Sequence, residues 1–197
     1  MGKSLFLTGD SGEGKTTLLF ECLKPFRAAT GGFYSQRLID EKGDTAGFRL
    51  ASVKEEWSPI ACYREGLTNI FLRRTKEGMV SFPEVFQKEG RRLLSVQGDD
   101  KFILMDEIGG VELLIPEFME VVHDCMKGPV PCIGVIKSRK NYALMMSRNG
   151  GNPSASHLRD ELEEAVLNNQ NNQLLTFSRK DEEAVRKKIL KYIREGI

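Results

Sequence analysis

The sequence predicts an α/β protein with a mostly parallel sheet and helices on both of its faces. Short continuous apolar runs recur along the chain, as expected for strands that are buried on both faces. Segments with helical periodicity separate these runs, and strands that alternate with helices form parallel sheets. Ligands of such sheets bind beyond the C-terminal ends of the strands.

The first predicted strand contains the apolar run Leu5 to Leu7, followed by a glycine-rich turn and a helix that ends before Pro25. The turn reads GDSGEGKTT and has the spacing of a P-loop. Its glycines let backbone NH groups point at phosphate oxygens, and the helix directs its positive end to the same place. The predicted phosphate-binding residues are Gly9, Asp10, Ser11, Gly12, Glu13, Gly14, Lys15, Thr16 and Thr17.

Two side chains of this loop have separate predicted roles. Lys15 reaches the β and γ phosphates and is a candidate catalytic residue. Thr16 places a hydroxyl where Mg²⁺ bridges those phosphates, because a hard cation prefers oxygen ligands. The predicted ligand is therefore a nucleoside triphosphate, and the predicted cofactor is Mg²⁺.

An antiparallel hairpin is predicted after the first helix. Gly31 to Ile39 and Gly47 to Val53 have the composition of strands, and a polar turn separates them. A third extended segment, Trp57 to Tyr63, is predicted to continue this antiparallel sheet. Pro59 favours an edge position for it, since proline donates no hydrogen bond to a neighbouring strand.

The middle of the chain predicts two helices, each followed by a strand. Ser81 and Glu84 have capping-box spacing, and the helix that follows leads into a strand at Lys101 to Met105. A second amphipathic helix is predicted at Pro116 to Lys127 and a buried strand at Cys132 to Ile136.

The last third of the chain begins with a segment of mixed character at 137–173. It contains an acidic helix with Leu158, Leu162 and Val166 on one face, and it ends in a polar loop. A last strand at Leu174 to Phe177 and a C-terminal helix follow, and Ser178 with Asp181 is predicted to cap that helix. The segment also holds the basic residues Lys137, Arg139, Lys140 and Arg148 and the breaker Gly150, Gly151, Asn152 and Pro153.

Composition limits the class of protein. The 197 residues fit one domain, with an insert-like segment at about 142–172. With 29 basic and 28 acidic residues, no global charge favours nucleic acid or an anionic membrane as a partner. No apolar run approaches membrane-spanning length. The cysteines Cys22, Cys62, Cys125 and Cys132 lack paired spacing and are predicted to be free thiols in the core of a cytoplasmic protein.

A second motif follows the apolar strand that ends at Met105. Asp106 is predicted to hold the Mg²⁺ shell, and Glu107 to accept a proton from a water that attacks the γ phosphate. Consecutive strand residues point to opposite faces, so both carboxylates reach one cavity only if the backbone bends. Gly109 and Gly110 favour such a bend. The candidate catalytic residues are Glu107 and Lys15, and the candidate metal ligands are Thr16 and Asp106.

An arginine that stabilises charge on the γ phosphate would complete such a site. Arg37, Arg49 and Arg139 are three candidates, and the sequence does not choose among them. His123 lies within a predicted helix and is interpreted as a surface or packing residue.

The segments GDSGEGKTT, GGFYSQRLIDEKGDTAGFRL and FILMDEIGGVEL resemble, in order and spacing, the cancer-related nucleoside-triphosphatase family of bacteria, archaea and animals. The likeness covers most of the chain, and DEIG with the downstream Glu112 is its more specific part. The resemblance implies a P-loop fold and slow Mg²⁺-dependent hydrolysis of several nucleoside triphosphates to diphosphate and phosphate. It also implies phosphate binding by Asp10 to Thr17 and a Walker B role for Asp106 and Glu107.

The chain departs from the family pattern in two places. Gly110 and Val111 stand where the family has Lys and Met, and the segment Tyr142 to Asn172 is longer than expected and different.

Three classes of function are compatible with these motifs. The first is a hydrolase, which Glu107 beside a Walker B aspartate favours. The second is a phosphotransferase, with Gly31 to Arg37 holding an acceptor and the basic stretch Lys137 to Arg148 closing over it. The third is a nucleotide-dependent binding module that uses the divergent segment to bind a protein partner, and the sequence does not identify that partner. The chain has no LSGGQ segment and no NKxD motif, which argues against transporter ATPases and regulatory GTPases.

Overall fold

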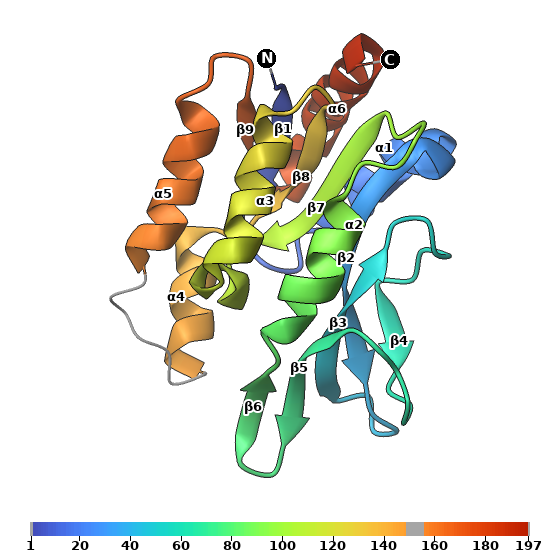
Figure 1. Cartoon of the computed structure of the whole chain (residues 1–197), viewed down its shortest axis with the longest axis vertical. Helices are drawn as coiled ribbons and strands as arrows, with labels where there is room; N and C mark the ends of the chain where they lie inside the picture. The colour runs from blue at the N-terminus through green and yellow to red at the C-terminus, as the bar shows by residue number, and fades with distance from the viewer. Residues whose placement is uncertain (1, 149–155, 197) are drawn as a thin grey trace.

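The structure is a computed structural model that describes residues 2–148 and 156–196. The strands are β1 (Ser4–Thr8), β2 (Thr30–Ile39), β3 (Thr45–Ser52), β4 (Ile60–Cys62), β5 (Ile70–Thr75), β6 (Gly78–Ser81), β7 (Phe102–Ile108), β8 (Cys132–Ile136) and β9 (Gln173–Thr176) (Figure 1). The α-helices are α1 (Lys15–Leu23), α2 (Arg91–Leu94), α3 (Pro116–Lys127), α4 (Arg139–Arg148), α5 (Ser156–Leu167) and α6 (Glu182–Gly196). The predicted breaker at 150–153 lies outside the described residues.

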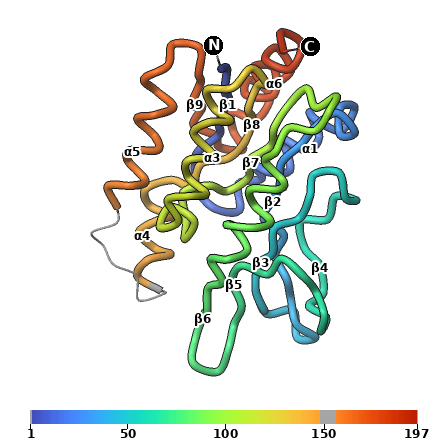
Figure 2. The backbone as a smooth tube through the Cα atoms, viewed as in Figure 1, coloured from blue at the N-terminus to red at the C-terminus, as the bar shows by residue number. Residues whose placement is uncertain are grey.

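One sheet of nine strands organises the described part of the chain. Its order is β6-β5-β3-β2-β7-β8-β1-β9, and β4 pairs with β2. The run from β2 to β9 is parallel, whereas β3, β5 and β6 extend it in antiparallel fashion. Figure 2 shows this extension and the α4–α5 segment on opposite sides of the parallel strands. The predicted α/β class and the β2–β3 hairpin are confirmed.

Two hydrophobic cores lie on the two faces of the sheet. Leu5 and Leu7 of β1 pack with side chains of α1 and α6. Phe6, which points the other way, belongs to a core that includes side chains of α2, α3 and α5. The strands therefore bury both faces, as continuous apolar runs predict.

The segment after β3 differs from the prediction. The predicted antiparallel strand at Trp57 to Tyr63 is wrong, because β4 pairs in parallel with residues Arg37 to Ile39 of β2. The reason is that β5 occupies the other edge of β3. Among the described strands, β4 pairs with β2 alone, which agrees with the edge position that Pro59 predicts.

The hairpin β5–β6 was not predicted, and it displaces the start of the next helix. Ser81 is the last residue of β6 rather than a helix cap. Phe82 N donates to Phe71 O at 2.9 Å, which keeps the chain in the hairpin pairing, and the helical turn starts after Pro83. The chain then passes through a π-helical turn, Phe86–Gly90, into α2.

The remaining elements follow the prediction closely. Helix α3 and strand β8 have the predicted bounds, and β9 begins one residue before the predicted strand. Helix α5 contains the predicted apolar face, with Leu162 and Val166 buried. The prediction that Ser178 and Asp181 cap the C-terminal helix is wrong in its geometry: Ser178 Oγ donates to Asp181 Oδ2 at 2.8 Å and not to a backbone NH, and a 3-10 turn, Arg179–Asp181, precedes α6. Helix α4, which covers most of the basic stretch, was not predicted.

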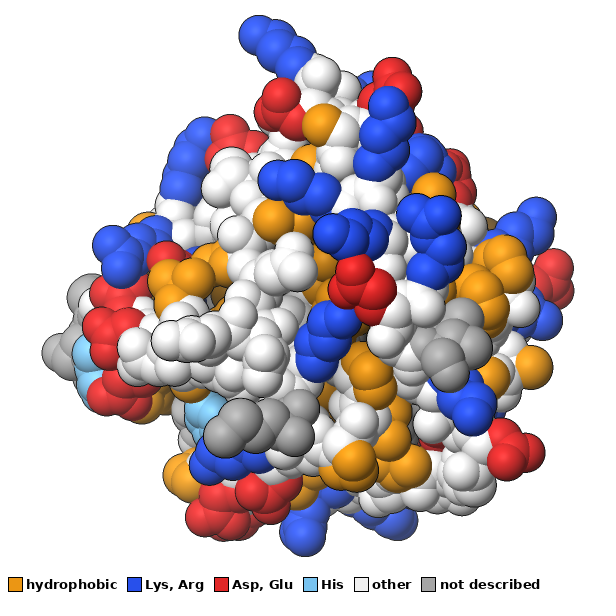
Figure 3. All heavy atoms as spheres, turned by 90° about the horizontal axis from the view of Figure 1, so that it is seen from above, with side chains coloured by type: hydrophobic (Ala, Val, Ile, Leu, Met, Phe, Trp, Pro, Cys, Tyr) orange, Lys and Arg blue, Asp and Glu red, His pale blue; other side chains and the backbone are white. Residues whose placement is uncertain are grey.

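Figure 3, seen from the end where the parallel strands begin, shows basic and acidic side chains interspersed. The four cysteines are free, and Cys22 and Cys132 are buried. The prediction of a core position is wrong for Cys62, which is exposed on the edge strand β4, and Cys125 is half-buried. In the described ranges, no helix has the length and apolarity needed to span a membrane.

Candidate functional site

The loop between β1 and α1 has the backbone conformation that its glycines predict. Gly9, Gly12 and Gly14 have φ angles of 144°, 83° and 95°, which side-chain-bearing residues rarely adopt. A Cβ atom on Gly9 would lie 2.4 Å from the carbonyl oxygen of Phe177, so only glycine fits beside the end of β9. Helix α1 begins at Lys15, and its N-terminus therefore faces the loop.

Lys15 is buried beneath this loop. Its Nζ atom donates to Gly9 O at 3.2 Å and to Asp10 O at 2.6 Å, and the residue is 4% exposed. Burial lowers the pKa of this ammonium, and the nearby carboxylates of Glu107 and Asp106 partly oppose that effect. The ammonium is thus held at the base of the loop by backbone oxygens.

Other loop side chains tie the loop to neighbouring elements. Asp10 forms a 2.8 Å ion pair with Lys140 of α4, and Asn141 Nδ2 donates to Gly9 O at 3.1 Å. Glu13 accepts a hydrogen bond from Arg179 N at 3.0 Å. Thr17 is exposed on α1. These contacts fix the position of the loop relative to α4 and to the chain after β9.

Strand β7 is irregular where it delivers its two carboxylates. Its register with β8 shifts between Met105 and Ile108, and Glu107 has a φ of 60°. The strand thus bulges at residues that would otherwise point to opposite faces. Asp106 and Glu107 consequently line one cavity, as predicted, but the bend occurs at Glu107, before Gly109 and Gly110.

Asp106 faces the P-loop helix. Its Oδ1 atom accepts a hydrogen bond from Thr16 Oγ1 at 2.7 Å, and Oδ2 accepts one from Ser35 N at 3.3 Å. The residue is 1% exposed, and burial raises its pKa to about 7, with the charge of Glu107 adding to the rise. The two predicted metal ligands, Thr16 and Asp106, are therefore in direct contact.

Glu107 faces a different partner. Lys137, the first residue after β8, places Nζ 2.8 Å from Glu107 Oε2. Burial alone would raise the pKa of Glu107, but the ammonium of Lys137 outweighs it and the pKa is lowered. Two adjacent carboxylates thus have pKa values shifted in opposite directions, a pattern typical of paired acid and base roles.

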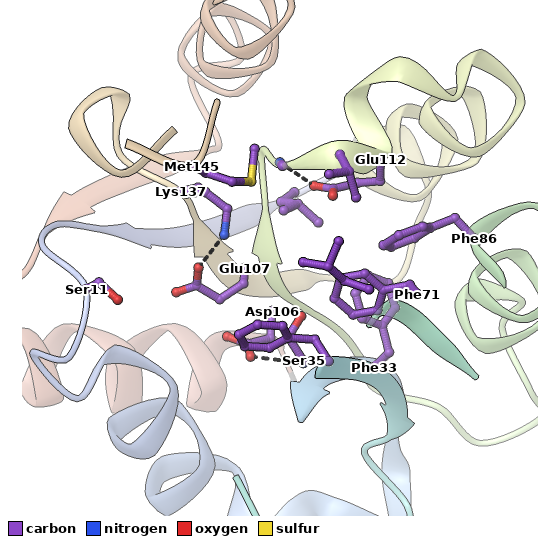
Figure 4. A pocket seen from close by; sticks show the side chains of 15 residues that line it. Ser11, Phe33, Ser35, Phe71, Phe86, Asp106, Glu107, Glu112, Lys137 and Met145 are labelled. Carbon is purple, nitrogen blue, oxygen red and sulfur yellow. Dashed lines mark hydrogen bonds and ion pairs between the residues drawn. The ribbon is translucent and has the colours of Figure 1, made fainter. Parts of the chain in front are cut away.

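A cavity of about 260 Å³ joins these polar groups to an apolar wall (Figure 4). Ser11, Asp106, Glu107 and Lys137 lie on its polar side. The apolar wall consists mainly of Phe33, Phe48, Phe71, Leu72, Phe86 and Met145. A wider cleft of about 650 Å³ leads outward between α4 and the β5–β6 hairpin.

Glu112 supports the turn after β7. The residue is 4% exposed, and its Oε1 atom accepts hydrogen bonds from Gly109 N at 2.6 Å and Gly110 N at 2.7 Å. Figure 4 shows it on the side of the cavity remote from Ser11. Its contacts hold the backbone that follows Glu107.

None of the three candidate arginines lines the cavity. Arg49 donates to Gln36 Oε1 and pairs with Glu55 at 2.7 Å. Arg139 pairs with Asp160 at 2.8 Å, and Arg37 is exposed on β2. His123 is half-buried on α3, and burial lowers its pKa, in agreement with a packing role.

Sequence reasoning missed Lys137, although a signal for it was present. It is the first polar residue after a buried parallel strand, which is the same rule that identified Asp106. The backbone NH of Ser35 was also missed, because no residue type marks a main-chain donor.

Comparisons with known proteins agree with this geometry. The NTPase family model matches residues 4–152. The nucleoside-triphosphatase THEP1 of Thermotoga petrophila is 32% identical over 148 residues, which cover 74% of this chain and 79% of the relative.

Two solved structures share the fold. The crystal structure of THEP1 from Aquifex aeolicus superimposes with a TM-score of 0.61 at 20% identity, over 96% of this chain and 98% of that one. The solution structure of a human cancer-related nucleoside triphosphatase has a TM-score of 0.63 at 18% identity, over 98% of each chain.

Proposed function

The chain belongs to the NTPase family, and from that premise we propose that it hydrolyses the γ phosphate of nucleoside triphosphates to give diphosphate and phosphate. The observation that carries this proposal is that Glu107 and the Thr16–Asp106 pair meet at the P-loop end of one sheet. The phosphate-binding loop, the metal-binding pair and the base would then all lie near the γ phosphate of a bound nucleotide.

Phosphate binding is assigned to residues 9–17. The backbone NH groups of Gly9 to Thr17 and the N-terminus of α1 provide donors and positive potential for the phosphate oxygens. Lys15 binds the β and γ phosphates, exchanging its contacts with the carbonyl oxygens of Gly9 and Asp10 for charge-assisted ones.

The residues at the base of the loop fit a magnesium ion. A hydroxyl and a buried carboxylate lie 2.7 Å apart, and both are oxygen donors of the kind that Mg²⁺ prefers. No group of three or more His, Cys, Asp or Glu side chains in residues 2–148 and 156–196 is placed to bind a metal. Thr16 and Asp106 would therefore share the ion with phosphate oxygens, as is usual for Mg²⁺ in phosphoryl transfer. When bound, the ion neutralises charge on the phosphates.

Glu107 is assigned as the base. It accepts a proton from a water whose oxygen forms a bond to the γ phosphorus. The bond between that phosphorus and the bridging oxygen breaks, and the electron pair remains on the diphosphate. Glu107 then returns its proton to the products or to solvent. The carboxylate lines both the inner cavity, which has an aromatic wall, and the wider outer cleft, from which water reaches it.

A phosphate-release assay tests the proposal. The protein is incubated with ATP, GTP, CTP and UTP, with and without Mg²⁺, and released phosphate is measured. Hydrolysis that requires Mg²⁺ supports the function, and absence of hydrolysis with every nucleotide would contradict it. Release that depends on an added nucleoside or nucleotide acceptor would indicate the phosphotransferase, which the names of the relatives do not favour. Tight binding without turnover would indicate a nucleotide-dependent module.

Three further assignments concern the domain organisation, the location and the partner of the chain. We propose that residues 1–197 act as one P-loop domain, in which α4 and α5 supply most of the divergent segment 142–172. The four free cysteines support a cytoplasmic location. The assigned partner is the nucleotide itself, rather than nucleic acid or membrane.

A further inference from the structure

Lys137 occupies a central position in the strand order. Its strand, β8, lies between β1, which leads into the P-loop, and β7, which delivers Asp106 and Glu107. The C-terminal ends of parallel strands meet at one edge of a sheet. Lys137 therefore lies between the loop that binds phosphates and the carboxylate assigned as base.

The surroundings of Lys137 leave room for its side chain. A Cβ atom on Gly110 would lie 3.3 Å from Lys137 Cε, and one on Gly109 would lie 3.4 Å from Lys137 Cβ. The turn after β7 passes against the lysine stem without side chains of its own. Figure 4 shows the ammonium directed across the cavity at Glu107.

The backbone of Lys137 is fixed from two sides. Its NH donates to Ile108 O at 2.8 Å, and its carbonyl accepts a hydrogen bond from Arg159 Nε at 2.8 Å. Arg159 is 2% exposed on α5 and also pairs with Glu163. Helix α5 thus holds the main chain of Lys137, while the ammonium is attached through a flexible four-carbon stem.

The site needs a cation near the γ phosphate in addition to Lys15. Charge that develops on the transferred phosphoryl group is usually stabilised by a second basic side chain. None of the three candidate arginines lines the cavity, because Arg49 pairs with Glu55, Arg139 pairs with Asp160, and Arg37 is exposed on β2. Lys137 lines both the inner cavity and the outer cleft, alongside Glu107.

We propose that Lys137 is a further catalytic residue whose ammonium moves from Glu107 to the γ phosphate when a triphosphate binds. This inference rests on the triphosphatase function proposed above. A terminal phosphate carries more negative charge than one carboxylate and offers more oxygens, so it competes for the ammonium. The transfer places positive charge on the reacting group and leaves Glu107 free to contact the attacking water. The position of the Lys137 ammonium therefore depends on whether the bound nucleotide has a γ phosphate.

The test measures discrimination between two nucleotides. Calorimetry with Mg²⁺ gives the Kd of ADP and of the non-hydrolysable β,γ-imido analogue of ATP for wild type, Lys137→Met and Lys137→Arg. Lys187→Met is the matched control, because Lys187 also forms an ion pair, at 2.9 Å with Glu183, but on the exposed face of α6. Circular dichroism and thermal melts, which do not depend on nucleotide binding, check that each variant remains folded.

The proposal predicts that Lys137→Met weakens binding of the triphosphate analogue at least tenfold and leaves ADP binding within about twofold. Lys137→Arg keeps the charge and retains most of the preference, and Lys187→Met equals wild type. Equal losses for both nucleotides, or no loss, in Lys137→Met would overturn the role of Lys137 while wild type still hydrolyses triphosphates. Wild type that binds neither nucleotide would overturn the proposed function together with this inference.

Discussion

The two halves of the site are built from different kinds of parts. At the end of β1, glycines with positive φ angles determine the course of the backbone, and Lys15 donates to carbonyl oxygens of its own loop. At the ends of β7 and β8, charged side chains from separate strands meet, as Lys137 and Glu107 do. The first half is local in sequence, and the second is assembled by the fold.

This contrast separates binding from chemistry. Backbone donors bind phosphate whatever reaction follows, so the β1 half accounts for affinity. Side-chain charges that face the γ phosphate act on the group that reacts, so the β7–β8 half is expected to affect turnover and the preference for a triphosphate, and to leave ADP affinity nearly unchanged. Substitutions in the two halves are therefore expected to differ in kind as well as in size.

The largest effect is expected at Lys15. Lys15→Met removes the only loop ammonium and should lower the phosphate-release rate by about 10³-fold, at the upper end for a single preorganised donor. Nucleotide affinity should fall as well, because this residue belongs to the binding half. Phosphate release and calorimetry measure the two quantities, with the exposed Lys24→Met as control. Nucleotide affinity equal to that of wild type in Lys15→Met would contradict the claim that the β1 half accounts for binding.

A smaller loss of activity, with a gain of stability, is expected at Asp106. Asp106→Asn removes a carboxylate assigned to the metal and should reduce turnover about 10²-fold. It also removes a buried charge, so in the absence of Mg²⁺ Tm should rise by about 3 °C near neutral pH, where 1 kcal/mol corresponds to about 2–4 °C.

The pH dependence of that gain follows from the pKa of Asp106. Its folded value, about 7, lies above the ordinary 3.8, so the stabilising contribution of this carboxyl is present below pH 3.8 and is lost as pH rises toward 7. The Tm difference between Asp106→Asn and wild type should therefore grow between pH 4 and pH 7. Thermal melts followed by circular dichroism check this, and a difference that stays constant with pH would contradict it.

The smallest effect is expected at Gly110. A methyl group there would lie 3.0 Å from Glu112 Oε2 and 3.3 Å from Lys137 Cε, so both side chains must shift by a few tenths of an ångström. We expect Gly110→Ala to lower kcat about three- to tenfold with little change in ADP affinity. A loss of nucleotide affinity with unchanged kcat would contradict the assignment of Gly110 to the β7–β8 half.

Sequence reasoning predicted the two halves unequally. The P-loop, its helix and the strands β7 and β8 follow from local patterns, since apolar runs and glycine spacing are read within a few residues. The bulge at Glu107 was expected only as a bend near Gly109, because a strained conformation at a glutamate has no sequence signal.

Features that depend on pairing between distant segments were missed. The parallel placement of β4 follows from β5 occupying the far edge of β3, which no local pattern reveals. The contact between Lys137 and Glu107 requires β7 and β8 to be neighbours. The sequence shows several basic residues after β8, and no local pattern distinguishes Lys137, which faces the site, from the others.

The assignment of Glu107 as base is tested most directly by single-turnover hydrolysis. Excess wild-type or Glu107→Gln protein is mixed with radiolabelled GTP and Mg²⁺, and GTP affinity is measured in parallel. Glutamine keeps the size of the side chain but does not accept the proton. We predict that phosphate release is about 10²-fold slower in Glu107→Gln and that its GTP affinity lies within a few-fold of wild type. Release at the wild-type rate would contradict it.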